Sequence, residues 1–200
     1  MPESCGTDAA RVLYRGCTPV TPIARGARSG YGWGMLSYQH IYHAGNLADV
    51  QKHAILCHVL DYLVQKDKPL TYIETHAGRG LYDLGSAEAL KTGEARSGIS
   101  LLEHKLSPGH PYRHRLNQVR ALHGPNAYPG SPLLAALTLR PQDTLHLAEL
   151  HPQEHHALYL ALADWDPKLY KKDGFQTALT LTPPTPRRGM MLVDPSYEVK

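Results

Sequence analysis

The sequence has 200 residues, of which 42% are hydrophobic and 20% are charged, and its net charge is +3 at pH 7. This length allows one domain, or one domain with a small insert, around a single hydrophobic core. No apolar run is long enough to span a bilayer, so we expect no membrane partner. Four arginines and two acids in residues 1–34 supply two of the three net charges. The nearly neutral remainder excludes a strongly basic nucleic-acid-binding protein, and any RNA contact must come from a local patch.

The N-terminal residues and the cysteines indicate where the domain begins and in which compartment the protein acts. Residues 1–34 are rich in Gly, Arg, Ala, Pro and Thr and have neither helical nor strand periodicity. We expect them to be a disordered or non-native N-terminal extension, with the domain covering residues 35–200. Cys5, Cys17 and Cys57 are too irregularly spaced for a disulfide framework or a zinc site. We therefore expect a cytoplasmic protein without a bound metal.

A long helix is predicted over residues 46–66. Asn46 is a suitable N-cap, and apolar residues recur after it at helical spacing. The proline at position 69 ends this helix, since it disfavours helical geometry in the preceding residue. Residues 70–74 then have the composition of a short strand, which leads directly into the glycine-containing turn of residues 75–80.

The rest of the chain alternates between helical and strand patterns. Residues 81–128 are polar, rich in His and Arg, and have only short helical stretches, which predicts a small helical insert. The following predicted elements are a helix at 133–139, a strand at 144–149, a helix from Pro152, a short helix at 175–181 and an apolar strand at 189–193. The last strand is wholly apolar, so we expect it to be buried on both faces. This alternation predicts an α/β fold with a doubly wound parallel sheet, in which ligands bind at the carboxyl ends of the strands.

Two of these strand ends carry groups suited to a nucleoside. Gly78 and Gly80 let the backbone approach a ligand closely, and Glu149 can accept both hydroxyls of a ribose. Asp83 occupies the place of the third glycine in a dinucleotide fingerprint, which argues against a nicotinamide-dependent oxidoreductase. The long separation of Glu149 from the glycine turn requires residues 81–128 to be an insertion. Alone, these features also fit an ordinary loop and a solvated acid.

The sequence Asp194-Pro195-Ser196-Tyr197 follows the last apolar strand and is the most informative tetrapeptide. It resembles the Asp/Asn-Pro-Pro-Tyr motif of amino-methyltransferases. The exocyclic amine of adenine is a poor nucleophile, and a carboxylate together with a backbone carbonyl can activate it by accepting its two N–H groups. An aromatic ring nearby can stack on a base that has been flipped out. An Asp-Pro turn with a surface tyrosine has the same local pattern.

Longer motifs point to one family. Residues 35–40 and the sequence Tyr42-His43-Ala44-Gly45-Asn46-Leu47-Ala48-Asp49-Val50-Gln51-Lys52-His53 closely resemble the N-terminus of the RlmJ-type 23S ribosomal RNA adenine-N6 methyltransferases. The resemblance continues in order through residues 75–78, 128–132, 149–152, 173–175 and 187–189. It implies a Rossmann-like fold, S-adenosylmethionine as cofactor, and methylation of the N6 amine of a specific adenine in 23S ribosomal RNA, which we expect to be protein-free or in an early stage of assembly. We expect a monomer.

The resemblance also implies roles for individual residues. Asp194 and Tyr197 are expected to act in catalysis, and Tyr38 is expected to reach the RNA. The implied cofactor-binding residues are His53, His76, Gly78, Ser131, Glu149, Asp173, Gly174 and Asp194. His53 shares a helical stripe with Asp49, Leu56 and Leu60, so it faces inward, as a hydrogen-bonded core histidine would also do.

Two departures from the family pattern bear on activity. Ser196 replaces the second proline of the motif and so removes some rigidity from its loop. The family continues beyond the position of Lys200 with further strands, so we expect the C-terminal strands to be missing and the last strand to be an open apolar edge. A chain ending there is expected to show little turnover.

Three alternatives stay open. The pattern His151-x-x-Glu154-His155 matches an inverted zinc-peptidase signature, but Pro152 at the helix start takes His151 off the required helical face. Related tetrapeptides also occur in DNA-adenine and guanine-N2 methyltransferases. An inactive remnant that still binds cofactor or RNA is the third alternative.

Overall fold

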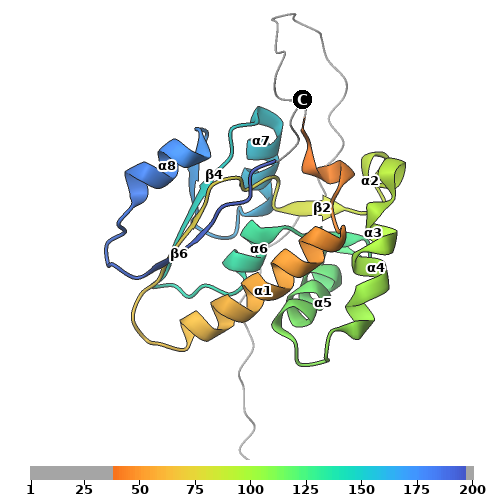
Figure 1. The fold of residues 1–200 in the computed structure, drawn as a ribbon, viewed down its shortest axis with the longest axis horizontal. Helices are drawn as coiled ribbons and strands as arrows, with labels where there is room; N and C mark the ends of the chain where they lie inside the picture. Colours follow the sequence, from red (N-terminus) through yellow and green to blue (C-terminus); the bar gives the residue numbers. More distant parts are fainter. Residues whose placement is uncertain (1–37, 197–200) are drawn as a thin grey trace, which may run out of the picture. The chain divides into compact units, whose positions relative to one another are not determined.

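The computed structural model describes residues 38–196, and Figure 1 shows their arrangement. Its centre is a parallel sheet of four strands in the order β5-β4-β1-β6. The strands are β1 (Thr71–Glu74), β4 (Thr144–Ala148), β5 (Lys168–Tyr170) and β6 (Gly189–Leu192). The predicted α/β fold with a parallel sheet is therefore confirmed. The expected N-terminal extension (residues 1–34) and the expected stacking residue Tyr197 lie outside the described residues.

The strand order reverses beside β1. The chain passes from β1 to β4 and β5 in one direction and then returns to place β6 on the other side of β1. In parallel sheets, a reversal of this kind opens a crevice at the carboxyl ends of the two strands that flank it. The loops that follow β1 and β6 therefore lie where a ligand is expected.

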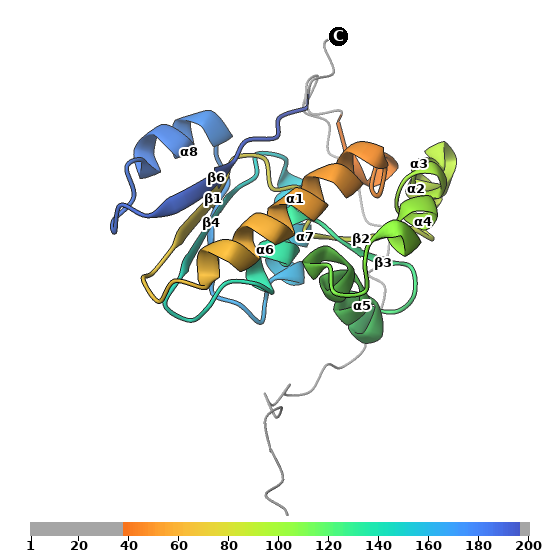
Figure 2. The same cartoon turned by 60° about the horizontal axis from the view of Figure 1, so that its bottom comes forward.

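Helices cover both faces of the sheet. Figure 2 shows α8 (Gly174–Leu181) on one face, with α1 (Leu47–Val64), α6 (Ser131–Ala136) and α7 (Pro152–Ala161) on the other. Crossovers between parallel strands are right-handed, so a helix changes face when the chain reverses direction. This explains why α8, which connects β5 to β6, lies alone on its face among these four helices.

The helix α1 contributes to two hydrophobic clusters. Leu56 and Leu60 pack into the cluster beneath the sheet, whereas Val50 and Cys57 pack into a second cluster with the insert. Burial on two sides fixes the rotation of α1 about its axis. Asn46 begins the helix as predicted, because its side chain accepts a hydrogen bond from the backbone N–H of Asp49 at 2.9 Å.

Two arginines hold the other end of α1. The guanidinium of Arg140 donates to the carbonyls of Val64 and Lys66 at 2.8 and 2.7 Å. The guanidinium of Arg188 donates to the carbonyls of Leu63 and Lys68. The last carbonyls of a helix have no partner within it, so these arginines satisfy them and attach α1 to the sheet.

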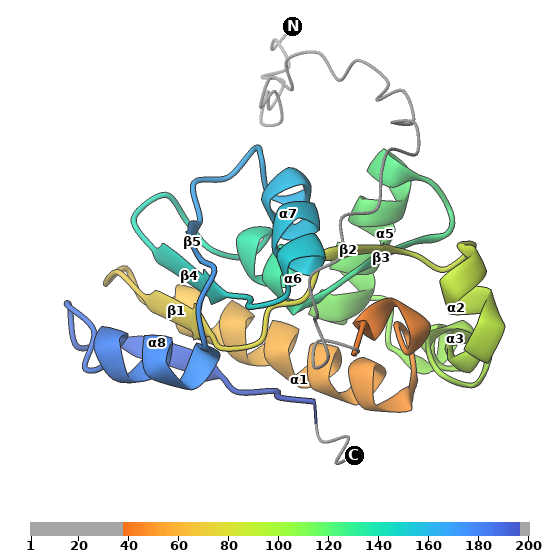
Figure 3. The same cartoon turned by 90° about the horizontal axis from the view of Figure 1, so that it is seen from above.

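The segment between β1 and α6 includes residues 81–128, for which a small helical insert is expected. It contains a two-stranded antiparallel sheet of β2 (Leu81–Asp83) and β3 (Ala127–Pro129), which the sequence did not predict. Its helical elements are α2 (Ala87–Thr92), α3 (Glu94–Ser97), α4 (Ile99–Leu102), η2 (Glu103–Lys105) and α5 (Pro111–His123). Figure 3 shows this region beside the main sheet. At 13 residues, α5 is longer than the short helices expected here.

Two expectations for the strands were wrong or incomplete. The last strand is not buried on both faces: β6 pairs only with β1 among residues 38–196, Gly189 is exposed, and the other three residues are half-buried. An edge strand lacks the neighbour that would cover its outer side, which explains the difference. The strand β5 was not predicted from the sequence.

None of the helices within residues 38–196 is long and apolar enough to cross a membrane.

Candidate active site

The glycine turn after β1 lies against Glu149. Gly78 and Gly80 have positive φ angles of 64° and 75°, which glycine adopts without strain. The backbone N–H of Gly78 donates to Oε2 of Glu149 at 2.8 Å. A Cβ atom on Gly78 would lie 2.5 Å from the hydroxyl of Tyr82, so the turn has no room for a side chain there.

Glu149 follows β4 and is oriented by two backbone groups. Besides the N–H of Gly78, its carboxylate accepts the N–H of His151, at 2.7 Å from Oε1. Each carboxylate oxygen has a second lone pair that remains able to accept a hydrogen bond. The side chain is thus held in place while it keeps its capacity to bind a diol.

The loop after β5 meets the loop after β1. Asp173 caps α8 by accepting the N–H of Gln176 at 2.9 Å. Gly174 begins α8 so close to β1 that a Cβ atom would lie 2.0 Å from the carbonyl oxygen of Thr75. The rings of His76 and Phe175 pack edge to face, with centroids 5.2 Å apart. The sequence motif Asp173-Gly174-Phe175 therefore has a packing role here.

His53 is buried in the wall of the cavity. Its side chain lies in α1 at 1% exposure, and its Nδ1 forms a 3.0 Å hydrogen bond with the hydroxyl of Tyr128. Burial lowers the pKa of His53 to about 3, against the raising effect of the Asp49 charge, so the ring is neutral at physiological pH. Its Nε2 is buried and has no hydrogen-bond partner among the described residues. A buried polar atom of this kind calls for a partner that a ligand can supply.

Ser131 and Glu74 form a buried pair below the crevice. The hydroxyl of Ser131 donates to Oε1 of Glu74, and the hydroxyl of Tyr72 donates to Oε2 at 3.0 Å. Burial raises the pKa of Glu74 to about 8, although these two hydrogen bonds act in the opposite direction. Glu74 therefore carries a proton at neutral pH.

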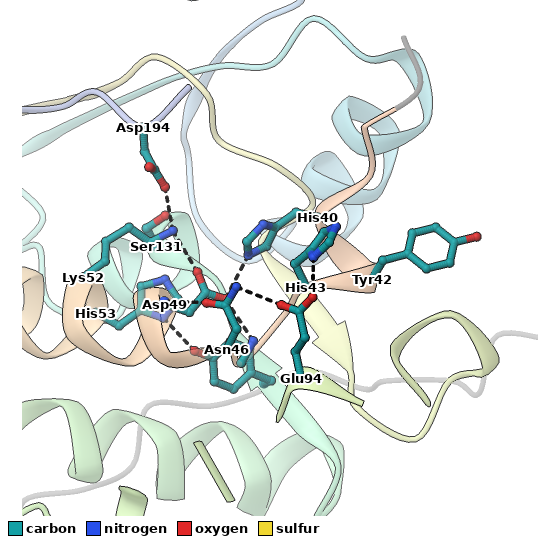
Figure 4. A network of polar contacts seen from close by, with 12 residues as sticks. His40, Tyr42, His43, Asn46, Asp49, Lys52, His53, Glu94, Ser131 and Asp194 are labelled. Carbon is teal, nitrogen blue, oxygen red and sulfur yellow. Dashed lines mark hydrogen bonds and ion pairs between the residues drawn. The ribbon is translucent and has the colours of Figure 1, made fainter. Parts of the chain in front are cut away.

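The loop after β6 is held by a lysine from α1. Nζ of Lys52 donates to Oδ2 of Asp194 at 2.7 Å and forms an ion pair with Oδ1 of Asp49 at 2.9 Å. Nε2 of His40 lies 2.8 Å from Oδ2 of Asp49, and Nδ1 of His40 lies 2.9 Å from the hydroxyl of Tyr38. Figure 4 shows the lysine between the two carboxylates, with His40 beside Asp49.

These groups surround one cavity of about 720 Å³. Seven of the residues expected to act in catalysis, cofactor binding or RNA contact line it, namely Tyr38, His53, His76, Gly78, Ser131, Glu149 and Asp194. Asp173 and Gly174 do not line the cavity, although Gly174 packs against Thr75 and the next residue, Phe175, packs on His76. The size is typical of small-molecule and cofactor sites.

Three lining residues with direct bearing on Asp194 were not predicted as site residues. His40 belongs to the stretch 35–40 and Asp49 and Lys52 to the stretch 42–53, and the sequence analysis gave none of the three a role in the site. The spacing of Asp49 and Lys52, at positions i and i+3 of a helix, is the signal that could have identified an ion pair. The contact from Lys52 to Asp194 spans 142 residues and has no local signal.

The described residues contain no group of three or more His, Cys, Asp or Glu side chains placed to hold a metal ion. In the zinc-peptidase-like pattern, the ring of His151 caps α7 and accepts the N–H of Gln153 at 3.2 Å. Glu154 forms an ion pair with Arg79. The residues of this pattern therefore cap α7 and hold Arg79 of the glycine turn.

The protonated state of Glu74 has a measurable consequence for stability. A carboxyl in an unfolded chain titrates near pH 4.3, whereas the pKa of folded Glu74 is about 8. Between these values the folded chain keeps a proton that the unfolded chain loses, so the contribution of this group to stability falls as pH rises through that window. We expect Glu74→Gln to raise the thermal midpoint relative to the parent chain more at about pH 8.5 than at about pH 5. A difference that is the same at both values would contradict a proton on Glu74.

Comparison with known proteins identifies the relatives of this chain. Residues 67–200 match the family model described as Ribosomal RNA large subunit methyltransferase D, RlmJ. The chain is 43% identical over 170 residues to the Escherichia coli (strain K12) protein named Ribosomal RNA large subunit methyltransferase J, covering 83% of this chain and 61% of that protein. The Haemophilus influenzae protein of the same name is 41% identical over 171 residues, with the same two coverages.

A solved structure is similar as well. The crystal structure of protein LPL1258 from Legionella pneumophila superposes with a TM-score of 0.69 at 42% identity, covering 78% of this chain and 59% of that one. The chain spans 61% of the length of the curated relatives that it matches. Because the family model covers two thirds of the sequence, the chain belongs to the family of RlmJ ribosomal RNA large subunit methyltransferases.

Proposed function

We propose that this chain binds S-adenosylmethionine and methylates the N6 amine of an adenine in protein-free 23S ribosomal RNA, acting as a cytoplasmic monomer. The observation that carries the proposal is the position of Asp194. This carboxylate follows β6 at the topological switch point and lines the same cavity as the glycine turn and Glu149. The family membership and the names of the relatives support the same reaction class.

The cavity suits the proposed cofactor. Glu149 has free lone pairs for a ribose diol, Gly78 lines the cavity without a side chain, and the Nε2 of His53 lacks a partner among the described residues. His76 and Ser131 complete the lining residues in the proposed set, and Asp173 and Gly174 join it from the start of α8. S-adenosylmethionine supplies an activated methyl group when bound.

Asp194 is proposed to activate the amine. Its Oδ2 is occupied by Lys52, and no described residue donates to its Oδ1. The free oxygen can accept one N–H of the adenine amine, and the carbonyl of Pro195 can accept the other. Hydrogen bonds of this kind favour the nucleophilic geometry of the nitrogen, and the carboxylate can take up the proton that the methylated amine releases. Tyr197 is proposed as the stacking ring on the basis of the sequence motif.

Tyr38 is proposed to contact the RNA. It lines the cavity, and its ring stacks on His43 with an interplanar angle of 4° and centroids 5.6 Å apart. A pair of stacked rings at a cavity offers an aromatic surface to an unpaired base.

Replacement of Glu149 tests the cofactor site. We expect Glu149→Ala to weaken the binding of S-adenosylmethionine by about 1–3 kcal/mol, because the ribose diol loses its acceptor. Calorimetry gives the dissociation constant, and Asp164→Ala, which removes an exposed carboxylate just beyond α7, is the matched control. Unchanged binding in a folded Glu149→Ala protein would remove Glu149 from the site.

Replacement of Asp194 tests the reaction. Single-turnover assays would follow transfer of a radiolabelled methyl group to protein-free 23S RNA, by the 200-residue chain and by the chain extended at Lys200 with the C-terminal part of its E. coli relative. Hydrolysis of the RNA to nucleosides then identifies the modified base. We expect N6-methyladenosine from the extended chain and its loss with Asp194→Ala, because the activation of the amine is realised mainly in the transition state.

The possible products separate the alternatives. Label on guanine N2 would contradict the adenine assignment, and label on DNA but not on RNA would contradict the substrate class. Cofactor binding without transfer to RNA or DNA in the extended chain would support the inactive remnant instead.

A further inference from the structure

Asp49 is a buried carboxylate in the first turn of α1. It is 2% exposed and meets three donors. Oδ2 accepts the backbone N–H of Gly45 at 2.9 Å and lies 2.8 Å from Nε2 of His40, while Oδ1 lies 2.9 Å from Nζ of Lys52. An acidic side chain is rarely buried to this degree unless it is paired. Two of its partners, His40 and Lys52, line the cavity together with Asp49.

The partner that matters for the reaction is Lys52. A lysine side chain has four flexible bonds, and fixing them costs conformational entropy. Nζ of Lys52 lies between Oδ1 of Asp49 and Oδ2 of Asp194. The buried carboxylate of Asp49 therefore fixes the position of the ammonium group. Asp194 is 40% exposed in a loop at the sheet edge, and Lys52 is the described residue that donates to its side chain.

Charge favours the same arrangement. Burial alone would raise the pKa of Asp49, but the hydrogen bond from His40 and the positive charge of Lys52 act against it and hold the pKa far below its usual value. Burial alone would lower the pKa of Lys52, but the charges of Asp49 and Asp194 outweigh it and raise the pKa well above its usual value. Two further titratable groups face Lys52, namely His53 and Glu74, and the charge of Lys52 acts to lower the pKa of each.

We propose that Asp49 is a positioning residue for methyl transfer: it fixes the Lys52 ammonium so that one oxygen of Asp194 is held and the other stays directed at the substrate amine. The proposal rests on the proposed function. Asp49 does not touch the reacting atoms and acts through Lys52. Asp49 also orients the ring of His40. The Nε2 atom of that ring faces Asp49, so its Nδ1 atom faces the hydroxyl of Tyr38.

A purely structural role is the competing explanation, because Asp49 also accepts the N–H of Gly45 at the entry to α1. The variant Asp49→Asn separates the two. Asparagine has nearly the same size and its oxygen can still accept that N–H, but it brings no charge to Lys52. The matched control is Glu94→Gln, because Glu94 accepts from His43 and Asn46 at the same end of α1 and does not contact Lys52.

The first measurement is the reactivity of Lys52 toward acetylation in the 200-residue chain, quantified by mass spectrometry against the exposed Lys66. Only the neutral amine reacts, and losing an adjacent carboxylate increases the neutral fraction about tenfold or more. We expect Asp49→Asn to raise the relative reactivity of Lys52 about tenfold at about pH 9, and Glu94→Gln to leave it unchanged.

The second measurement is the single-turnover rate of methyl transfer in the extended chain. We expect Asp49→Asn to lower this rate about tenfold or more, with the dissociation constant for S-adenosylmethionine changed less than about threefold. A weaker cofactor affinity with an unchanged rate would indicate a structural role and overturn the proposal.

The two measurements also distinguish failure of this inference from failure of the proposed function. If neither the extended parent chain nor its variants transfer methyl groups, the proposed function fails. The acetylation result then still decides whether Asp49 holds Lys52. Equal Lys52 reactivity in the parent chain and in Asp49→Asn overturns the proposal whatever the activity.

Discussion

The Lys52 ammonium between two carboxylates is the contact on which the candidate site depends. One carboxylate, Asp49, is buried in α1, and the other, Asp194, lies in the loop after β6. Burial of α1 in two hydrophobic clusters fixes the rotation of the helix, and the arginines at its end fix its place along the sheet. A rigid helix thus positions a charge that an edge loop could not position alone, since a loop has few contacts of its own.

The sheet brings the other half of the site to the same place. Because its strands are parallel, their carboxyl ends share one side, and the loops continue to pair beyond the strands. Ala77 donates to the carbonyl of Ala148 at 3.0 Å, Thr75 donates to Leu192 at 3.1 Å, and Glu149 donates to Tyr170 at 3.0 Å. The glycine turn, the carboxylate proposed to bind the diol and the carboxylate proposed to act in catalysis are therefore fixed relative to each other before any ligand binds, which reduces the entropy cost of binding.

Local patterns predicted the parts of the fold that local chemistry determines. The Asn46 cap, the strands at 71–74 and 144–148 and the helix from Pro152 follow from caps, β-formers and proline geometry, and the structure has them. The short strand Lys168–Tyr170 has no alternation to detect, and its pairing with β4 is a tertiary contact. The burial of the last strand was predicted wrongly, because apolar composition does not report whether a neighbouring strand is present. Asp194 was found from a tetrapeptide and a resemblance, whereas its lysine partner lies 142 residues away and needed the structure.

A double-mutant cycle on Lys52 and Asp194 tests the central contact most directly, without any assay of activity. The free energies of unfolding would be measured by urea titration at low salt for the parent chain, Lys52→Met, Asp194→Asn and the double variant. The cycle removes the cost of leaving Asp49 unpaired, which both Lys52→Met proteins share. We expect the effects to be non-additive by at least about 0.5 kcal/mol, in the direction of a favourable pair. Additive effects would show that Lys52 does not hold Asp194, and would contradict the organisation of the site described above.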